Sequence, residues 1–493
     1  MGTPRTELAY PLDLVALGDD RATPLYRQLC DQLRRLILTG AVPSGTRIPS
    51  IRAAALGLGV SRNTVVAALD QLAAEGLLET HHGQGTRVAA AAPARAAPAA
   101  GAYQSAAGDG LSARGRLMAA QPRVRTRPGH SAFHPGTPAI EEFPFKTWSR
   151  ILSRTARAGG EDLFGYHYIA GHPDLREAIA SFLTAMRGVR CTPEQIVVTT
   201  GGQAALDLLA RLLLDEGDTV WMEEPGYLGA RGAFLAAGAR LAPLAVGRDG
   251  WQLPRPDAPA PRLVYLTPSC QHPLGITMPL DGRREMLARA RRHDAWVVED
   301  DFDGEYTFRG APLPAMQGLD AQARVVYLGT FAKTLFPSMR LGFAVLPREL
   351  AERARTALSL TGQFAPLVPQ AALAAFIREG FFFRHLNRMR RLYARRRATF
   401  MRLLADELGD LLDPIDGRTG IQIAAPFRVP LGDRAVVARC HAEGIHPAPL
   451  SLYFVGPPAL SGLLLGYAGL AEPAMQRAIP RLRHIVEEAA RLR

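Results

Sequence analysis

The first 88 residues carry the hydrophobic periodicity of a small helical domain. Residues 24–39 place leucines one helical turn apart, and further helices are predicted to begin at Ser50 and at Ser61. Two short strands around a glycine-rich turn are predicted over residues 77–89. This order of helix, helix, tight turn, helix and hairpin is typical of a winged helix-turn-helix.

The pattern changes further along the chain. Residues 89–125 are rich in Ala, Pro and Gly and have too little apolar bulk to pack, so we expect a flexible linker. Residues 126–493 alternate short apolar runs with helix-length segments, which predicts an α/β fold with a mostly parallel sheet between helices. The apolar runs are QIVVTT, TVWME, RLVYLTP, AWVVEDD, VVYLGT and LGFAVL. We therefore predict three parts, with the helical domain at residues 1–88.

The net charge of +12 invites a nucleic-acid partner, but the charge is not concentrated in the helical domain. Residues 1–88 contain nine Arg against eight Asp plus Glu, so a DNA contact there has to come from local placement. Outside this domain, the basic stretch of residues 384–397 places four arginines on one helical face. That face is either solvated or a phosphate-binding stripe. Its members are Arg384, Arg388, Arg391 and Arg395.

Composition disfavours several other classes of protein. The four cysteines have no paired spacing, so neither a disulfide framework nor a metal site is indicated. The N-terminus lacks the pattern of a signal peptide, and no apolar run approaches the roughly 20 residues that span a bilayer. We expect a cytoplasmic, nucleoid-associated protein without a membrane partner.

The start of the predicted third helix has the residues of a DNA-recognition helix, whose first turn enters the major groove. Arg62 could contact guanine or phosphate, and Asn63 could pair with adenine. Arg52 on the preceding helix is placed to contact the DNA backbone. A small bundle that binds only protein is the alternative. The candidate DNA-binding residues are Arg52, Ser61, Arg62, Asn63 and Thr64, with His82 and Gly83 at the tip of the predicted wing.

These residues also resemble a known family. The stretch PLYRQLCDQLRRLILTGAVPSGTRIPSIR, followed by GVSRNTVVAALDQLAAEGLLETHHGQGT, closely resembles the GntR family of bacterial winged-helix regulators. The resemblance implies a dimer that binds a double-stranded DNA operator sequence-specifically. It also implies DNA contacts at Arg52, Arg62, Thr64 and the wing tip of His82 and Gly83.

One lysine in the second half of the chain stands out because lysine is rare here. The chain has 58 Lys plus Arg but only two lysines, Lys146 and Lys333. An amine can lose its proton and add to a carbonyl, whereas a guanidinium stays protonated. Lys333 therefore points to Schiff-base chemistry with an aldehyde, with an ordinary surface lysine as the alternative.

Other residues supply what a pyridoxal phosphate site needs. Arg340 offers a bidentate phosphate partner, and Thr330 adds a hydroxyl group. Asp300 ends an apolar strand and could keep the cofactor's ring nitrogen protonated. Each residue alone has an ordinary structural explanation, but their order on an α/β pattern predicts a cofactor site. The remaining candidates are Gly201, Gly202 and Gln203, where a strand-to-helix turn offers backbone N–H groups, and Tyr227 as a stacking ring.

The region from about residue 130 to the end resembles fold-type I aminotransferases of the aspartate aminotransferase superfamily. The matching pieces are FHPGTPAIEEFP, YHYIAGHPDLREAI, TTGGQAALDLL, EEPGYLGAR, TPSCQHPLG, EDDFDGEY and GTFAKTLFPSMRLG. A GntR-type head joined to such a body is the arrangement of the MocR subfamily of regulators. The resemblance implies pyridoxal 5'-phosphate as cofactor and a homodimer in which Tyr166 reaches the phosphate of the other subunit. It implies an effector that is an amino compound or pyridoxal phosphate itself.

Several family positions are altered in this chain. Phe302 replaces the phenol that normally contacts the cofactor's 3-oxygen, and His272 stands where related aminotransferases have an Asn beside that oxygen. His272 could supply the missing donor or pack there without a cofactor contact. Ala204 and Ala332 replace a Gln and a Ser. Leu464 aligns with the Arg that binds the substrate carboxylate, and losing one partner of such a desolvated pair costs about 2–5 kcal/mol.

The sequence thus predicts a pyridoxal phosphate-dependent transcriptional regulator whose DNA binding responds to the cofactor or to an amino compound. It could control amine metabolism or, as a sensor of the cofactor itself, vitamin B6 supply. The alternative is a working aminotransferase that carries a DNA-binding domain. Leu464 and Phe302 argue against it, although Arg231 could bind a carboxylate instead. We expect at most a half-reaction.

Overall fold

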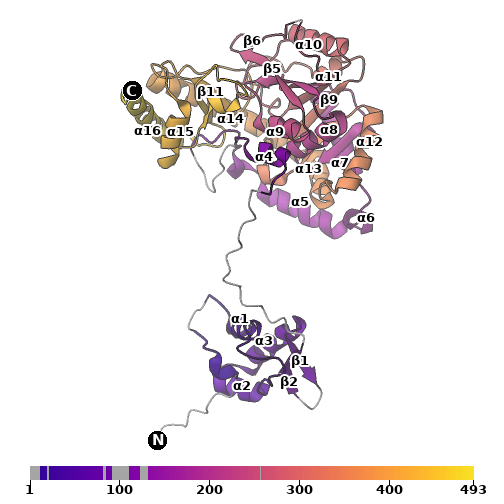
Figure 1. The fold of residues 1–493 in the computed structure, drawn as a ribbon, viewed down its shortest axis with the longest axis vertical. Coiled ribbons are helices and arrows are strands. Elements are labelled where there is room, and N and C mark those ends of the chain that lie inside the picture. Colours follow the sequence, from indigo (N-terminus) through magenta and orange to yellow (C-terminus); the bar gives the residue numbers. More distant parts are fainter. Residues whose placement is uncertain are drawn as a thin grey trace. The chain divides into compact units, whose positions relative to one another are not determined.

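The computed structural model describes residues 11–18, 22–81, 85–90, 110–122, 132–255 and 257–492. Among these residues the chain forms two compact units, one up to residue 110 and one from residue 111 onward (Figure 1). Most of the predicted linker, residues 89–125, lies outside the described residues, so its boundaries stay a prediction.

The described residues of the first unit form three α-helices and a two-stranded hairpin in the predicted order, preceded by a short 3-10 helix. Leu29 and Leu33 belong to one buried apolar cluster with Val65 and Leu72, and this cluster holds the first and third helices together. The leucine periodicity read from the sequence therefore marks the buried face at Leu29 and Leu33, whereas Leu25 at the start of α1 is exposed. The elements are η1 (Leu12–Leu14), α1 (Leu25–Leu38), α2 (Ile51–Leu58), α3 (Arg62–Ala74), β1 (Leu78–His81) and β2 (Gly85–Val88).

Local capping sets where the helices of this unit begin. The side chains of Ser50 and Ser61 each accept a hydrogen bond from the backbone N–H three residues on, which fixes the starts of α2 and α3. Gly59 ends α2 with a φ of +68°, a left-handed conformation that glycine adopts without steric cost. These three residues make the tight turn between the helices possible.

An ion pair also ties α1 to the end of α3. Arg34 donates from Nε to Oε2 of Glu75 at 2.7 Å and from Nη2 to Oε1 at 2.6 Å. Because both side chains are partly exposed, the pair contributes at most about 1 kcal/mol to stability. Its bidentate geometry still fixes the orientation of α3 on α1.

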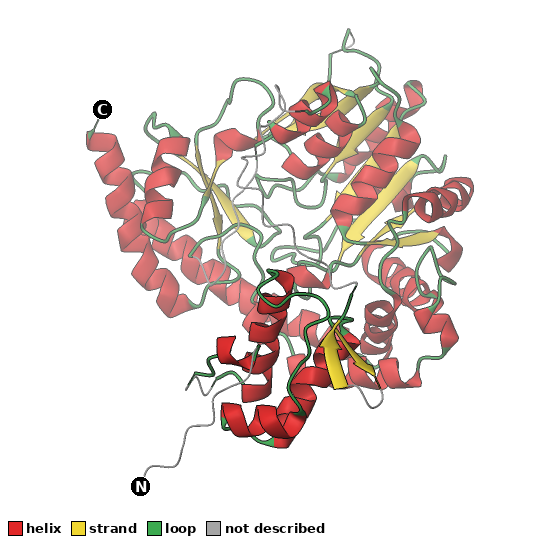
Figure 2. Cartoon of the chain, turned by 60° about the horizontal axis from the view of Figure 1, so that its bottom comes forward, coloured by secondary structure: helices red, strands yellow, loops and turns green. Residues whose placement is uncertain are grey.

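The second unit is built on an eight-stranded, mostly parallel sheet (Figure 2). Its strand order is β3-β10-β9-β8-β7-β4-β5-β6, in which β10 and β6 run antiparallel to their neighbours. All six predicted apolar runs form strands here, while β5 and β6 were not predicted. The strands are β3 (Ile196–Thr199), β4 (Thr219–Glu224), β5 (Arg240–Gly247), β6 (Gly250–Trp251), β7 (Leu263–Leu266), β8 (Trp296–Asp301), β9 (Val325–Thr330) and β10 (Gly342–Val345).

Helices cover both faces of this sheet, which accounts for the nearly continuous apolar strands. On one face, α8 (Gly202–Leu213), α9 (Leu228–Ala236) and α12 (Arg348–Thr361) share a buried cluster with the strands. The other face is covered by α5 (Phe145–Ala158), α7 (Pro173–Arg187), α10 (Leu280–Arg292), α11 (Met316–Leu319) and α13 (Leu367–Arg378). The short elements are α4 (Ala113–Ala119), which contacts α9, and η2 (Ile140–Glu142), α6 (Glu161–Phe164), η3 (Pro193–Gln195) and η4 (Pro337–Met339).

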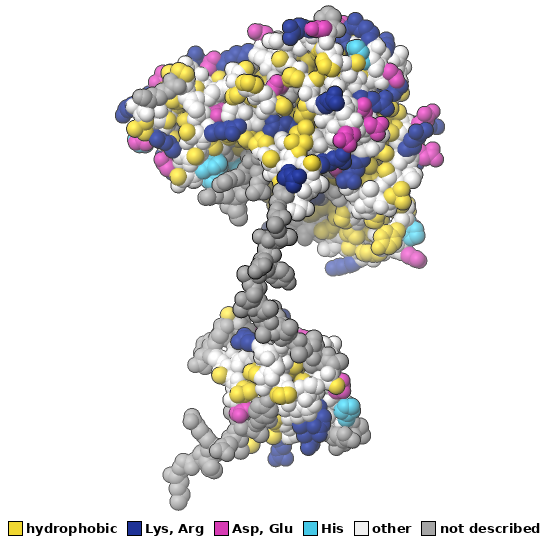
Figure 3. All heavy atoms as spheres, in the orientation of Figure 1, with side chains coloured by type: hydrophobic (Ala, Val, Ile, Leu, Met, Phe, Trp, Pro, Cys, Tyr) yellow, Lys and Arg dark blue, Asp and Glu magenta, His cyan; other side chains and the backbone are white. Residues whose placement is uncertain are grey.

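A C-terminal lobe adds a small antiparallel sheet that was not predicted. It has the order β11 (Gln422–Pro426), β13 (Gly462–Gly466) and β12 (Ala448–Pro449), with η5 (Leu450–Tyr453) after β12. The lobe's helices are α14 (Phe381–Leu408), α15 (Asp433–Ala442) and α16 (Glu472–Arg491). The four arginines predicted on one face of residues 384–397 are all exposed on α14. Figure 3 shows Lys and Arg side chains interspersed with Asp and Glu over the large unit.

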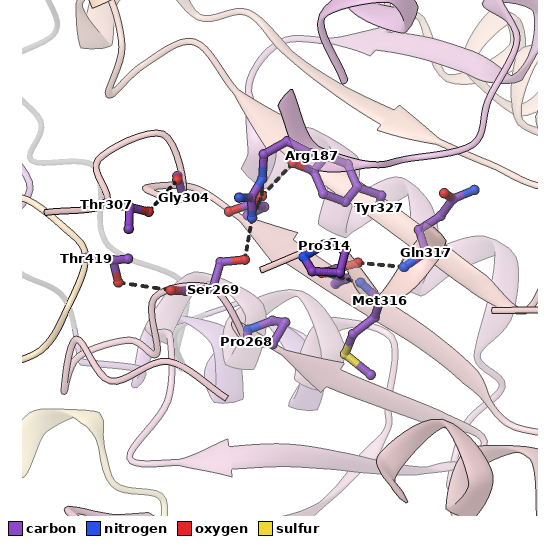
Figure 4. A network of polar contacts seen from close by, with 12 residues as sticks. Arg187, Pro268, Ser269, Gly304, Thr307, Pro314, Met316, Gln317, Tyr327 and Thr419 are labelled. Carbon is purple, nitrogen blue, oxygen red and sulfur yellow. Dashed lines mark hydrogen bonds and ion pairs between the residues drawn. The ribbon is translucent and has the colours of Figure 1, made fainter. Parts of the chain in front are cut away.

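A buried polar network lies beside the end of β8 (Figure 4). Arg187 at the end of α7 donates from Nε to Oδ2 of Asp301 at 2.7 Å and from Nη2 to the hydroxyl of Ser269 at 2.6 Å. The Tyr327 hydroxyl donates to the same Asp301 oxygen at 2.6 Å. Successive residues of a strand face opposite sides of the sheet, so Asp300, the residue before Asp301, faces the other side. The network therefore anchors β8 from the side opposite Asp300.

Candidate functional site

A cavity of about 610 Å³ lies at the carboxyl ends of β8 and β9, with walls from both the large sheet and the C-terminal lobe. Its volume falls in the usual range for small-molecule sites, roughly 300–1,000 Å³. The cavity brings together every predicted cofactor residue except Tyr166. Those residues are Lys333, Asp300, Arg340, Thr330, Gly201, Gly202, Gln203, Tyr227 and His272.

The amine of Lys333 is held by the backbone of a distant segment. Its Nζ donates a hydrogen bond of 2.7 Å to the carbonyl oxygen of Gly136. Gly136 has a φ of +66°, and a Cβ there would lie 2.6 Å from Nζ, so only glycine leaves room for the amine. Burial lowers the pKa of Lys333, while the carboxylates of Asp303 and Asp300 act in the opposite direction. A lowered pKa favours the neutral, nucleophilic amine.

Asp300 occupies the second-to-last position of β8 and lines the same cavity. The Tyr265 hydroxyl on the neighbouring strand β7 donates to its Oδ2 at 2.7 Å. Burial raises the pKa of Asp300 to about 6, although the bond from Tyr265 favours the charged form. A cationic ring nitrogen placed against this carboxylate would restore its charge and hold its own proton.

An anion cradle forms where β3 turns into α8. Gly201, with a φ of +96°, precedes the helix, so the first N–H groups of α8 face the cavity without side-chain obstruction. The guanidinium of Arg340 lies about 3.4–3.5 Å from where a Cβ of Gly201 would be. A Cβ on Gly342 would lie 2.8 Å from the Gly202 nitrogen, which makes this close approach depend on glycine. Thr330 lines the cavity nearby, on β9.

Aromatic rings form another wall. The centroids of Tyr227 and His272 lie 5.5 Å apart with their planes at 88°, and His272 contacts Phe302 in the same edge-on manner at 5.6 Å. Burial, together with the positive charge of Lys333, lowers the pKa of His272 to about 3, so the imidazole is neutral. Burial raises the pKa of Tyr227 to about 12.

Sequence reasoning missed residues that the fold brings from far away in the chain. Gln422 on β11 and Tyr453 on η5 line the cavity from the C-terminal lobe. The amide of Gln422 donates to Nδ1 of His272 at 3.2 Å, which leaves the imidazole proton on Nε2. Tyr265 and Gly136 were also missed. Of these four residues, only Gly136 had a signal in the sequence, because it lies in the FHPGTP stretch that resembles aminotransferases.

Three residues that the sequence singled out lie away from the cavity surface: Leu464, Tyr166 and the alternative carboxylate partner Arg231. Leu464 is fully buried in β13, and Arg231 on α9 lines a different cavity, where its Nη1 donates to the carbonyl of Phe454 at 2.8 Å. Tyr166 is 85 % exposed and contacts Phe364 edge-on at 6.0 Å, outside the cavity of its own chain.

Four of the predicted DNA-contact residues, Ser61, Arg62, Asn63 and Thr64, lie at the start of α3, whereas Arg52 lies at the start of α2, away from the α2–α3 turn. Arg62 and Asn63 are exposed in the first turn of α3, and Arg52 is exposed in the first turn of α2. Ser61 is the N-cap of α3, and its hydroxyl also lies 2.8 Å from that of Thr64, so both have a structural role. The predicted wing tip, His82 and Gly83, lies outside the described residues.

Comparisons with known proteins match both units. The family of bacterial regulatory proteins called gntR matches residues 25–88, and aminotransferase class I and II matches residues 139–428. The probable rhizopine catabolism regulatory protein MocR of Rhizobium meliloti is 51 % identical over 95 % of both chains. The pyridoxine biosynthesis transcriptional regulator PdxR of Corynebacterium glutamicum is 30 % identical over 94 % of this chain and 96 % of its own.

Among solved structures, the α-aminoadipate aminotransferase LysN of Thermus thermophilus, complexed with N-(5'-phosphopyridoxyl)-L-leucine, matches 74 % of this chain and 94 % of its own. The identity is 30 % and the TM-score is 0.68. Fold and site thus define a winged helix-turn-helix head on a pyridoxal phosphate-binding aminotransferase-type body. The chain belongs to the MocR subfamily of GntR-type transcriptional regulators.

The residues of the cavity fit the cofactor of this fold. Lys333, whose Nζ lies in a pocket that depends on glycine, matches the cofactor's aldehyde. The cradle at Gly201 beside Arg340 matches its phosphate, and the buried carboxylate of Asp300 matches its ring nitrogen. The protein is a pyridoxal phosphate-linked regulator that binds DNA through its GntR-type unit. Within the described ranges, no helix has the length and apolar composition that a membrane span requires.

Proposed function

We propose that the chain acts as a homodimer at the nucleoid, in the cytoplasm, and that an amino compound in the Lys333 cavity changes its affinity for an operator. One observation carries the proposal. A capped helix that exposes Arg62 and Asn63 occurs in the same chain as a cavity that combines a buried amine, a carboxylate and an anion cradle. A recognition surface and a ligand site are the two parts that an effector-controlled regulator needs.

Each cavity residue has a role in this proposal. Lys333 attaches the cofactor, whose aldehyde reacts with primary amines. Asp300 keeps the ring nitrogen protonated, and Tyr227 stacks on the ring. Neutral His272, with its proton on Nε2, replaces the donor lost at Phe302. The phosphate is held by Arg340, Thr330 and the N–H groups of Gly201, Gly202 and Gln203, together with Tyr166 of the partner subunit.

In the head, Arg62 and Asn63 read bases in the major groove, while Arg52 and Thr64 contact phosphates and Ser61 supports the turn. His82 and Gly83 reach the minor groove from the wing. The head comprises residues 1–88, joined by a linker at 89–125 to the effector domain at 126–493. The names of the two regulatory relatives support control of a metabolic pathway, catabolic for MocR and biosynthetic for PdxR.

A mobility shift of DNA from the region upstream of the gene tests the proposal. The holoprotein should bind this DNA, and a primary amine that also changes the cofactor's absorbance should change its affinity at least about tenfold, a coupling of roughly 1.4 kcal/mol. If amines change the absorbance but leave the DNA affinity unaltered, the proposal is wrong.

The similarity to PdxR favours a second candidate, a sensor of pyridoxal phosphate itself. In that case the cofactor alone should change the DNA affinity of the apoprotein, and added amines should have no further effect. The same mobility shift, run on apoprotein with and without cofactor, separates the two candidates. Sustained production of keto acid from an amino acid would instead show a working aminotransferase.

A further inference from the structure

We propose that a second groove on the large unit, distinct from the cofactor cavity, binds an organic anion that joins a carboxylate or phosphate group to an apolar body. The groove has a volume of about 570 Å³ and lies between α4, α9 and the C-terminal lobe. Figure 1 shows α4 beside α9, which it contacts. Among the described residues, Pro122 alone lines both cavities, so this site is independent of the effector function proposed above.

Three arginines line this groove, and none of them pairs with a described carboxylate. Arg231 lies on α9, Arg240 begins β5 and Arg434 lies on α15. No described Asp or Glu lines the groove. Guanidinium groups that lack a carboxylate partner give a concave surface a positive potential, which attracts anions. Arginine also binds carboxylates and phosphates in bidentate geometry.

Arg231 is the buried anchor of the site. Only 6 % of it is exposed, and its Nη1 donates to the carbonyl oxygen of Phe454 at 2.8 Å. Its Nε is buried without a hydrogen-bond partner, and no described residue bonds its Nη2. Glu224, whose charge acts on Arg231, instead accepts two backbone N–H bonds at 2.7 Å. Because a buried guanidinium with unused donors is costly, an anion at this position would stabilise it.

The rest of the groove is largely apolar. Leu235 and Leu241 belong to α9 and β5, Leu452 and Val455 to the C-terminal lobe, and Leu117 to α4. All five side chains are half-buried or exposed. A ligand with a hydrocarbon body would remove them from water, whereas a small inorganic anion would leave them hydrated. The combination of cations and hydrocarbon therefore points to an amphipathic anion.

The short helix α4 is the weakly held wall of this groove. None of its residues is buried, and Leu117 is 43 % exposed. The helix is capped by Ser112, which accepts from the N–H of Gly115, and Arg114 lies 3.5 Å from Glu216 on the body. A ligand between α4 and the C-terminal lobe would cover Leu117 and hold α4 against α9. We therefore expect ligand binding to protect α4, which lies in the predicted linker.

Calorimetric titration of the holoprotein tests the proposal with 3-phenylpropionate, phenyl phosphate and the neutral analogue 3-phenylpropanol. At least one of the two anions should bind at least about tenfold more tightly than the alcohol, because only an anion pairs with Arg231. The tighter of the two identifies the anionic group as carboxylate or phosphate. Inorganic phosphate should bind more weakly than phenyl phosphate, because it leaves the apolar wall uncovered.

Variants assign the binding to this groove. Arg434→Ala should weaken binding of the anion about two- to fivefold, as expected for an exposed charge pair. Arg439→Ala removes an exposed arginine from the same helix outside the groove and should leave the affinity unchanged. Arg231→Gln should weaken binding more than about tenfold. If Arg231→Gln fails to fold, as circular dichroism would show, the comparison of Arg434→Ala with Arg439→Ala still decides.

Limited digestion with trypsin gives a second readout, since Arg114 and Arg116 are exposed on α4. Cleavage after these residues should slow at least about threefold with saturating anion and stay unchanged with 3-phenylpropanol. Three results would overturn the proposal: binding of the alcohol as tight as that of both anions, equal affinities in Arg434→Ala and Arg439→Ala, or cleavage of α4 at the same rate with and without the anion.

Discussion

The hydroxyl of Tyr265 on β7 donates a 2.7 Å hydrogen bond to Oδ2 of Asp300 on the adjacent strand β8. The bond fixes one carboxylate oxygen inside the cavity and favours the charged form of a group whose pKa burial has raised to about 6. On the opposite face of β8, Asp301 is fixed in the same way by Tyr327 and Arg187. Two buried phenols thus hold neighbouring carboxylates on the two faces of one strand.

Tyr265→Phe should weaken binding of pyridoxal phosphate by about three- to tenfold near neutral pH, because Asp300 loses a hydrogen bond to its charged form. Absorbance titration of the apoprotein measures this. Tyr327→Phe is the matched control, since it removes the same group from Asp301 outside the cavity. A larger loss of cofactor affinity in the control than in Tyr265→Phe would contradict this role for Tyr265.

Cofactor affinity should fall as the pH is lowered through about 6. In the free protein the pKa of Asp300 is raised to about 6, and a cationic ring nitrogen beside it would lower that pKa. Binding then favours the deprotonated carboxylate, so affinity is full above pH 6 and is lost below it by up to about tenfold per pH unit. Asp300→Asn, measured across the same pH range, should bind the cofactor without this pH dependence. An unchanged pH profile of cofactor affinity in the variant would assign the dependence to another group.

Arg62→Ala should abolish specific operator binding while the cofactor's absorbance stays as in the unaltered protein. Arg62 is exposed in the first turn of α3, where loss of one base contact costs roughly 1–3 kcal/mol. Footprinting or mobility shift gives the readout. Arg35→Ala removes another exposed arginine, from α1, and should weaken binding far less. An intact footprint in Arg62→Ala would exclude α3 as the recognition helix.

Arg187→Ala should lower the free energy of unfolding by about 3–5 kcal/mol, because Asp301 would be left as a buried, uncompensated charge. Arg378→Ala breaks an exposed ion pair with Asp174 and should cost at most about 1 kcal/mol. Urea denaturation compares the two. Equal losses would mean that the network beside β8 does not anchor the strand.

Much of the fold could be predicted because a strand that is covered by helices on both faces is continuously apolar in sequence. The apolar runs from QIVVTT to LGFAVL all became strands, and Ser50 and Ser61 stand at the starts of their helices. The C-terminal sheet was missed. Its strand β12 has only two residues, and the apolar run of β13 gives no sign of its partner β11 about 40 residues earlier.

The candidate site was predictable where the chemistry demands one residue type. Lys333 stood out because the chain uses arginine almost everywhere else, and Gly201 because a turn that binds phosphate needs an open backbone. Gln422, Tyr453 and Tyr265 could not be found, since each is an ordinary side chain that only the packing of the two lobes or of adjacent strands brings to the cavity. Burial also set the charge state of His272, which its sequence neighbours do not reveal.

Borohydride reduction of the holoprotein, followed by peptide mass spectrometry, tests the central claim most directly. Lys146 is exposed on α5 and serves as an internal control within the same chain. A phosphopyridoxyl group found on Lys333 alone, and lost in Lys333→Ala, is the predicted result. A group on Lys146, or no modification of either lysine, would contradict the claim that Lys333 holds the cofactor of this regulator.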